Sequence, residues 1–381
     1  MTRLLVSCGE PSGDLYAAEL VAQLRRSLPR LDVFGLGGER LEAQGAALRA
    51  NVRELAVVGL FEVVAHLGRL RRVLRDLLAE VDRGRPQAAV LVDYGGFNLR
   101  LAAALRRRGI PVVYYVSPQV WAWRRGRVRH IRRTVSRMLV IFPFEEPLYR
   151  AAGVPVRFVG HPLVDLAAPA PDRAAFLSGQ GLDPDRPVLA VLPGSRPREI
   201  AHNLPPIADA LRRLRGARPE VQFLIAVAPS IDPDALRAPL AGLSVRLAAG
   251  VTHAALGACT AAIVASGTAT VEAALLGAPM VVVYRLSALT YHLGRRFVNV
   301  PHYAMANLIA GRRLVPELIQ AEFTGSRVAA EALRLLEDED ARRRMKEGLA
   351  EVRAKLGGPG ASARAAAEVL AMLASSHAEN P

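Results

Sequence analysis

The stretch on which the fold depends covers residues 265–284 and reads Ala-Ser-Gly-Thr-Ala-Thr-Val-Glu-Ala-Ala-Leu-Leu-Gly-Ala-Pro-Met-Val-Val-Val-Tyr. It follows an apolar run at 261–264 and passes from small hydroxyl and glycine residues, through a helix-forming run, to the β-branched run 281–283. This order predicts a strand, a tight turn, a helix and a second strand.

The turn in this stretch predicts an anion-binding site. Ser266, Gly267 and Thr268 would lie at the N-terminus of the helix, where unpaired N–H groups and the helix dipole attract anions. A nucleotide diphosphate fits such a site, and Glu272, one turn into the helix, could accept hydrogen bonds from ribose hydroxyls. The alternative is an ordinary Ser or Thr N-cap followed by a helix.

Strand-like and helix-like runs alternate along both halves of the chain. This alternation predicts an α/β protein with parallel sheets and crossover helices. Because 381 residues are more than one core usually serves, we expect two domains, at 1–165 and 166–344, with the Pro-, Ala- and Asp-rich residues 161–187 connecting them. The strand candidates are residues 3–8, 32–36, 87–93, 111–116, 137–142, 156–159, 188–192, 221–226, 244–247 and 261–264.

Composition narrows the class of protein. The net charge of +15 points to nucleic acid, an anionic membrane surface or phosphorylated substrates. Since every basic residue except Lys346 and Lys355 is arginine, biased nucleotide composition is a competing explanation. Cys8 and Cys259 do not have the spacing of a zinc site or a disulfide framework, and there is neither a signal peptide nor an apolar run of membrane-spanning length. We therefore expect a cytoplasmic protein.

Polar residues follow several of the predicted strands, where open α/β sheets bind their ligands. Asp93 ends one buried run and could act as a general base toward a sugar hydroxyl or cap the next helix. The turn at residues 9–14 follows the first strand. Arg196, in the loop after residues 188–192, carries a fork of donors suited to phosphate.

Two further segments are apolar or aromatic with interleaved arginines. Residues 55–78 have helical spacing of apolar side chains, which suits either an anionic bilayer and acyl chains or a core-facing helix with solvated arginines. Trp121 and Trp123 precede six arginines within residues 124–133. That second pattern is compatible with nucleic acid, with a phosphate-bearing glycolipid, or with a solvated helix face.

Taken together, six blocks in order resemble the lipid-A-disaccharide synthase family. They are Gly9-Glu10-Pro11-Ser12-Gly13-Asp14, residues 115–123 around Ser117-Pro118 and Trp121-Ala122-Trp123, Phe158-Val159-Gly160-His161-Pro162, Leu192-Pro193-Gly194-Ser195-Arg196, Ala265-Ser266-Gly267-Thr268-Ala269 with Glu272, and Asn307-Leu308-Ile309-Ala310-Gly311-Arg312.

The resemblance implies an inverting glycosyltransferase of the GT-B type: two Rossmann-like domains whose parallel sheets face a central cleft, with helices at about 345–381 returning to the N-terminal domain. The family transfers 2,3-diacylglucosamine from UDP-2,3-diacylglucosamine to the 6-hydroxyl of 2,3-diacylglucosamine 1-phosphate (lipid X). The products are UDP and the β-1′,6-linked lipid A disaccharide 1-phosphate. The resemblance further implies no cofactor, no metal, and peripheral association with the inner face of the cytoplasmic membrane.

Carried over residue by residue, the resemblance makes Asp93 the general base. It assigns the UDP-sugar to Ser195, Arg196, Ser266, Gly267, Thr268, Glu272 and Asn307. The resemblance assigns the acceptor side of the cleft to Glu10, Ser12, Asp14 and Ser117. Membrane and acyl contact falls on Leu60, Phe61, Val64, Leu67, Arg69 and Arg72.

Besides a catalytically silent, membrane-associated relative of the family, two alternatives stay open at this point. One is a different GT-B enzyme that uses a UDP-sugar, either a transferase with another lipid acceptor or an epimerase. The other is a basic nucleic-acid-binding protein, which would leave Asp93, Arg196 and Glu272 unexplained. We rank a nucleic-acid partner below the lipid reaction, and we also consider a homodimer.

Overall fold

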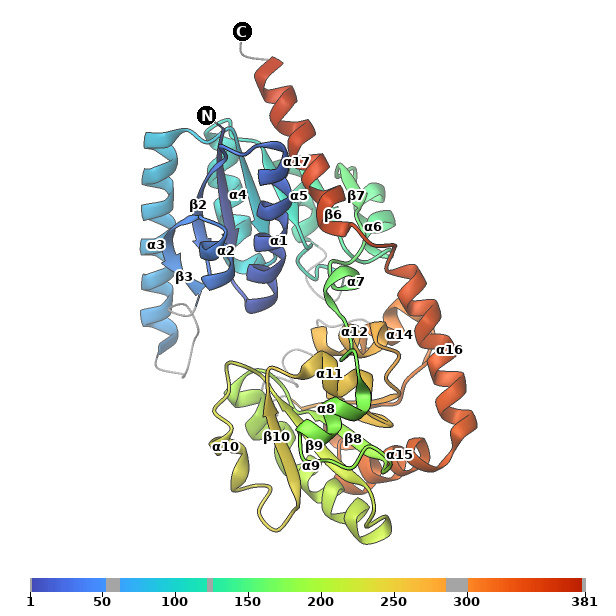
Figure 1. The fold of residues 1–381 in the computed structure, drawn as a ribbon. Coiled ribbons are helices and arrows are strands. Elements are labelled where there is room, and N and C mark those ends of the chain that lie inside the picture. Colours follow the sequence, from blue (N-terminus) through green and yellow to red (C-terminus); the bar gives the residue numbers. More distant parts are fainter. Residues whose placement is uncertain (1, 53–61, 122–125, 286–300, 379–381) are drawn as a thin grey trace. The chain divides into compact units, whose positions relative to one another are not determined.

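The computed structural model describes residues 2–52, 62–121, 126–285 and 301–378, and it divides into two compact units (Figure 1). The first unit comprises Met1–Pro162 and Leu356–Pro381, and the second comprises Leu163–Lys355. Helix α16 (Glu339–Lys355) therefore belongs to the second unit, which corrects the expectation that residues from about 345 onward return to the first. Of the two C-terminal helices, α17 (Ala361–Ala378) is the one that belongs to the first unit.

The first unit is built on a seven-stranded parallel sheet in the order β3-β2-β1-β4-β5-β6-β7. The middle strands are continuous apolar runs, and all five residues of β4 are buried, as in parallel sheets covered on both faces. The strands are β1 (Arg3–Cys8), β2 (Asp32–Gly37), β3 (Ala47–Asn51), β4 (Ala88–Val92), β5 (Val112–Tyr115), β6 (Arg137–Val140) and β7 (Val156–Phe158).

Helices cover both faces of this sheet. One core contains Leu77 of α3, Leu101 of α4, Ile131 of α5 and Tyr149 of α6, packed against Tyr114 and its neighbours in the sheet. Helices α1 and α17 contact one another, as Figure 1 shows. The helices are α1 (Pro11–Ser27), α2 (Glu39–Ala43), α3 (Glu62–Gly84), α4 (Gly95–Arg107), α5 (Arg127–Thr134) and α6 (Glu145–Ala151).

The second unit contains a six-stranded parallel sheet in the order β10-β9-β8-β11-β12-β13. Its strands are β8 (Val188–Leu192), β9 (Gln222–Val227), β10 (Val245–Ala249), β11 (Ala261–Ala265), β12 (Met280–Tyr284) and β13 (Glu317–Ile319). Its helices are α7 (Leu163–Leu166), α8 (Arg173–Gly179), α9 (Pro197–Ala217), α10 (Asp234–Arg237), α11 (Thr252–Ala258), α12 (Thr268–Leu275), α14 (Met305–Ala310), η2 (Gln320–Glu322), α15 (Gly325–Glu337) and α16. Residues 265–284 thus form the predicted turn, helix and strand.

The predicted connection at 161–187 is not a simple linker. It carries α7 and α8, and α8 packs on α11 of the second unit. Asp172 caps α8 by accepting the N–H of Ala175, and the Arg173 guanidinium donates to the carbonyl of Ala258 at 3.0 Å. These contacts fix the segment to the second sheet's helices.

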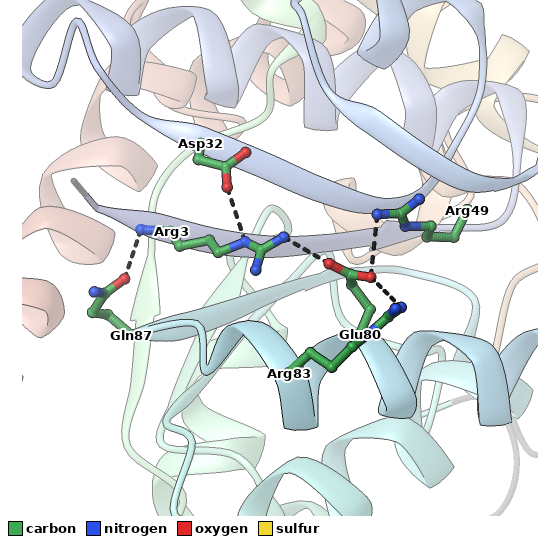
Figure 2. Close-up of polar contacts among 6 residues, drawn as sticks. All are labelled: Arg3, Asp32, Arg49, Glu80, Arg83 and Gln87. Atoms are coloured by element: carbon green, nitrogen blue, oxygen red, sulfur yellow. Dashed lines mark hydrogen bonds and ion pairs between the residues drawn. The ribbon is translucent and has the colours of Figure 1, made fainter.

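Charged side chains fix the amino ends of the strands in the first unit. Glu80 of α3 is buried, and its carboxylate pairs with Arg3 of β1 at 2.7 Å, Arg49 of β3 at 3.1 Å and Arg83 at 2.7 Å (Figure 2). Arg3 also pairs with Asp32 at the start of β2, at 2.9 Å. The hydrogen bond from Arg3, with the charges of Arg49 and Arg83, lowers the pKa of Glu80 against the opposing effect of burial. One carboxylate therefore joins a helix to two strands.

We predict that Glu80→Gln lowers the free energy of unfolding by about 2 kcal/mol at neutral pH, because the arginines lose their common counter-charge. A carboxyl group with a lowered folded-state pKa contributes its full stability above its unfolded pKa and loses that stability as the pH falls through the folded pKa. The difference between wild type and variant in urea unfolding should therefore shrink in acid.

Asp82→Asn is the matched control on the same helix. Asp82 is exposed, and among the described residues its ion pair is with Arg108. We expect a much smaller change in the urea midpoint. Equal effects of the two substitutions would show that the Glu80 cluster does not stabilise the fold.

Candidate functional site

Asp93 lies directly after β4, at the carboxyl edge of the first sheet. Its backbone is in the left-handed region with φ +47°, followed by Tyr94 at +50°, and Val116 after β5 has φ +62°. Such angles are costly for residues with a side chain and persist only where the surroundings impose them. Here the Asp93 N–H donates to the carbonyl of Tyr115 at 3.0 Å, and its own carbonyl accepts the Tyr114 hydroxyl at 2.6 Å. These bonds fix the backbone that carries the half-buried Asp93 side chain.

Asn98, in the first turn of α4, joins the ends of β1 and β4. Its side chain is fully buried, and Nδ2 donates to the carbonyls of Ser7, Val92 and Asp93 at 3.0–3.1 Å. Its Oδ1 accepts the Ser7 hydroxyl at 2.7 Å. This asparagine was not among the predicted site residues, because only the folded sheet brings Ser7 beside Val92.

The turn after β1 lies against the turn after β4. A Cβ on Gly9 would meet the Tyr94 ring at 2.0 Å, so glycine is required for this close approach. Glu10 and Ser12 are partly exposed at the start of α1. Their predicted place near Asp93 is consistent with this packing, and burial, then the charge of Glu10, raises the pKa of Tyr94.

Asp14 has a different role from the predicted acceptor contact. It is buried, and its carboxylate accepts the N–H groups of Gly38, Arg40 and Leu41 at 2.7, 3.1 and 3.3 Å. These donors lie at the start of α2, where unpaired N–H groups attract a carboxylate. Asp14 therefore anchors α2.

Ser117 and Glu145 lie at the ends of the next two strands, β5 and β6. Ser117 is buried, with its Oγ 2.6 Å from the Tyr149 hydroxyl. The carboxyl group of Glu145 is almost fully buried and accepts the Trp121 indole N–H at 3.1 Å. Burial raises the pKa of Glu145 to about 8, helped by the charge of Asp93. Sequence reasoning missed Glu145, although its place just after a strand was a usable signal.

In the second unit, the loop after β8 carries Ser195 and Arg196. Gly194 has φ +131°, and a Cβ there would meet the Glu199 carboxylate at 2.6 Å. The Ser195 N–H donates to that carboxylate at 2.9 Å, and Arg196 is the N-cap residue of α9. Fully buried Asn203 ties the loop to the end of β12, since its Nδ2 donates to the Pro193 carbonyl at 3.0 Å and its Oδ1 accepts the Arg285 N–H at 3.2 Å.

The predicted anion site lies at the end of the neighbouring strand, β11. The N-cap of α12 is Gly267, with φ +144° and no side-chain cap, and both Gly267 and Thr268 are exposed. This geometry differs from the ordinary Ser or Thr N-cap. Ser266 Oγ donates instead to the Tyr303 carbonyl at 3.0 Å, and Glu272 lies 3.1 Å from Nε2 of His253.

Asn307 stabilises the segment before and within β13 through internal hydrogen bonds, which differs from the predicted direct contact with a nucleotide. It is fully buried; its Oδ1 accepts the N–H groups of Leu314 and Val315, and its Nδ2 donates to Val315 and Glu317. The Glu317 carboxylate also accepts the Ala304 N–H at 2.8 Å. Glu317 is a second missed residue, since its edge strand β13 has only three residues.

The predicted membrane residues are described only in part. Leu60 and Phe61 lie outside the described residues, and Val64 and Leu67 belong to α3, on which the described side chains begin at residue 68. Arg69 and Arg72 are exposed on α3. The second half of α3 places Leu77 and Val81 in the core, as the core-facing alternative required.

Comparison with known proteins identifies the family. The family model for lipid-A-disaccharide synthetase matches residues 4–370. The chain belongs to this family. A lipid-A-disaccharide synthase from Myxococcus xanthus is 48% identical over 374 residues, which cover 97% of each chain.

Solved structures that resemble the chain at low identity show its fold. The UDP-GlcNAc 2-epimerase from Neisseria meningitidis, bound to UDP-GlcNAc, has a TM-score of 0.69 at 12% identity and covers 97% of this chain and 100% of its own. The calicheamicin glycosyltransferase CalG4 has a TM-score of 0.61 at 18% identity, with 98% of both chains covered. The predicted GT-B fold is confirmed, and the chain is a glycosyltransferase of lipid A biosynthesis.

Two properties of the described residues bear on membranes and metals. None of the described helices is both long enough and apolar enough to cross a bilayer. Within the same residues, His, Cys, Asp and Glu side chains do not gather in threes that could hold a metal ion.

We predict that Asn307→Ala destabilises this family member by about 2–4 kcal/mol, because it leaves the N–H groups of Leu314 and Val315 without their acceptor. Residues 301–304, whose N–H groups at Tyr303 and Ala304 bond to Glu317, should lose order as well. Chemical unfolding measures the first effect, and amide hydrogen exchange at residues 301–307 measures the second.

Arg312→Ala serves as the control within the same sequence block. Arg312 is half exposed and pairs with Glu351 at 2.8 Å. Its removal should leave unfolding nearly unchanged. Unchanged stability in Asn307→Ala, with nucleotide binding lost, would instead return Asn307 to direct ligand contact.

Proposed function

We propose that the chain transfers 2,3-diacylglucosamine from UDP-2,3-diacylglucosamine to the 6-hydroxyl of lipid X. The products would be UDP and the β-1′,6-linked disaccharide 1-phosphate. The observation that carries the proposal is Asp93, a carboxylate held in a strained backbone conformation at the carboxyl end of β4. Because the chain belongs to the lipid-A-disaccharide synthase family, the reaction proposed for this carboxylate is the transfer of a sugar to a lipid acceptor.

Asp93 acts as the general base in this proposal. It takes the proton of the acceptor hydroxyl while that oxygen attacks the anomeric carbon from the face opposite UDP, which inverts the configuration. The hydrogen bonds from Tyr114 and Asn98 to its carbonyl hold the backbone, so little reorganisation accompanies the proton transfer. Glu10, Ser12 and Ser117 form the acceptor side near this carboxylate.

The second unit binds UDP in this proposal. Arg196 offers a guanidinium at the loop after β8, and exposed Gly267 and Thr268 offer backbone N–H groups at the start of α12. Both lie at the carboxyl ends of adjacent strands, β8 and β11, so one diphosphate could contact both. Arg196 and these N–H groups would stabilise the charge that develops on the leaving diphosphate, while Glu272 accepts from the ribose. The UDP-GlcNAc bound to the Neisseria epimerase supports a nucleotide-sugar site on this fold.

We also propose peripheral contact with the cytoplasmic membrane through the first unit. Exposed Arg69 and Arg72 on α3 would meet anionic lipid headgroups. Flotation with phosphatidylglycerol vesicles should be lost in the double variant Arg69→Glu/Arg72→Glu and retained in Arg334→Glu of α15. Equal flotation of all three proteins would exclude this contact surface.

We predict that Asp93→Asn lowers the rate of sugar transfer at least about 100-fold, because a general base typically accelerates a reaction by at least that factor. The affinity for the UDP-sugar should stay nearly unchanged. Steady-state UDP release measures the rate, and calorimetry measures donor binding. Normal turnover in this variant would remove Asp93 from the role of base.

Arg196→Ala is the reciprocal variant. It should weaken UDP binding about tenfold or more, since a charge-assisted hydrogen bond to phosphate is lost. Arg198→Ala, a change at a neighbouring exposed arginine, should not. Unchanged UDP affinity in Arg196→Ala would refute its assignment.

A further inference from the structure

A buried polar cluster lies at the ends of β5 and β6, and the proposed mechanism gives no role to Glu145, its carboxyl group. Glu145 is 1% exposed, and its two carboxyl oxygens accept the Trp121 indole N–H at 3.1 Å and the Phe142 backbone N–H at 3.3 Å. Beside it, Ser117 contacts the Tyr149 hydroxyl at 2.6 Å and donates to the Pro118 carbonyl at 2.9 Å. The cluster therefore binds the loop after β5 to the start of α6.

The indole of Trp121 is fixed by this cluster and by aromatic neighbours. Its ring meets Phe144 edge-on with centroids 5.2 Å apart, and Phe144 stacks on Phe142 at 5.6 Å with an angle of 4° between the planes. All three rings are only partly buried. They form a row of apolar surface whose first member is oriented by a hydrogen bond to Glu145.

This row lies at the same sheet edge as Asp93. Strands β4, β5 and β6 are consecutive neighbours, and Asp93, Ser117 and Glu145 follow their respective carboxyl ends. The Asp93 N–H bonds to Tyr115, the residue before Val116, and the Val116 N–H bonds to Leu139 of β6. A change in the loop after β5 would therefore reach the backbone that holds Asp93.

We propose that Glu145 is a positioning residue for the acceptor: it holds the Trp121 indole and the Ser117 loop as a fixed wall beside Asp93, against which the acceptor's sugar ring packs. The inference rests on the proposed transfer to a lipid-linked sugar. Pyranose rings present C–H groups that pack on aromatic faces, and the row offers such faces at the same edge of the sheet as the base.

The protonation state of Glu145 fits this role. Its raised pKa of about 8 keeps the group mainly a neutral acid at pH 7, which avoids placing a second negative charge near the Asp93 carboxylate. Among the described residues, the Tyr149 hydroxyl on α6 is an ionisable neighbour of Glu145, and Tyr114 of β5, next to Tyr149, faces Asp93 and Arg127. Above about pH 8, a second carboxylate forms beside Asp93.

Kinetics of Glu145→Leu, Glu145→Gln and Glu146→Gln test the proposal. Leucine removes both acceptors and should raise KM for lipid X about tenfold, with KM for the UDP-sugar within about twofold. Glutamine keeps an acceptor oxygen and should restore KM for lipid X to within about threefold. Glu146 is the neighbouring carboxylate, paired with Arg150 on the surface, and its change should alter neither KM.

Tryptophan emission gives a readout that does not need turnover. In a Trp123→Phe background Trp121 is the single tryptophan, and its emission should change with a midpoint near pH 8. Adding Glu145→Gln should abolish that change, while Glu146→Gln should preserve it.

The outcomes separate this inference from the proposed function. Wild-type transfer with equal KM values in all three Glu145 and Glu146 variants, or a pH-dependent emission that survives Glu145→Gln, would overturn the positioning role. A wild-type protein that makes no disaccharide but shows the emission change would overturn the proposed reaction, and with it the role of Glu145 toward an acceptor, while leaving the Glu145–Trp121 contact established.

Discussion

Buried asparagine side chains hold the carboxyl ends of the strands in place, and the candidate site depends on them. Asn98, Asn203 and Asn307 are each fully buried. The amides of Asn98 and Asn203 each bond to backbone groups of two separate segments, and the Asn307 amide bonds to the backbone of Leu314 and Val315 and to the Glu317 carboxylate. Burying an amide side chain costs free energy unless its donors and acceptors are hydrogen-bonded. Each of these asparagines meets that requirement by bonding to backbone groups that the pairing of the strands leaves without a partner. Asn98 and Asn203 fix the loops that carry Asp93 and Ser195, and Asn307 fixes Glu317, whose carboxylate accepts the N–H groups of Tyr303 and Ala304.

The two ends of the first sheet therefore have different chemistry. At the amino end, Glu80 and its arginines join α3 to β1 and β3 by charge. At the carboxyl end, neutral donors and acceptors hold Asp93 and Tyr94 in left-handed backbone conformations. Ion pairs thus fix the amino end of the sheet, while the strained backbone lies at the carboxyl end, beside the proposed general base.

Most of the fold could be predicted from sequence because its strands are continuous apolar runs. Strands β1 and β8 have the predicted bounds, and residues 265–284 gave the turn, helix and strand correctly. The edge strands β3 and β13 were missed, since each is short and partly exposed and lacks the apolar run of a central strand. Helices α7 and α8 were hidden in a Pro-rich segment that resembles a linker.

The site was less accessible to sequence reasoning. Position after a strand was enough to select Asp93 and Arg196. Position after a strand did not show that Asp14 anchors α2, or that the Asn307 amide forms hydrogen bonds with Leu314, Val315 and Glu317. Those partners are brought together only by the folded loops. Glu145 needed burial and the Trp121 contact to stand out from its exposed neighbour.

The central claim is that this chain joins two acylated sugars and releases UDP. The direct measurement is UDP release by the purified protein supplied with UDP-2,3-diacylglucosamine, with and without lipid X, together with mass spectrometry of the lipid product. The account predicts UDP release that depends on lipid X and a product with the mass of the disaccharide 1-phosphate. UDP release without lipid X, or donor binding with no disaccharide formed, would contradict it.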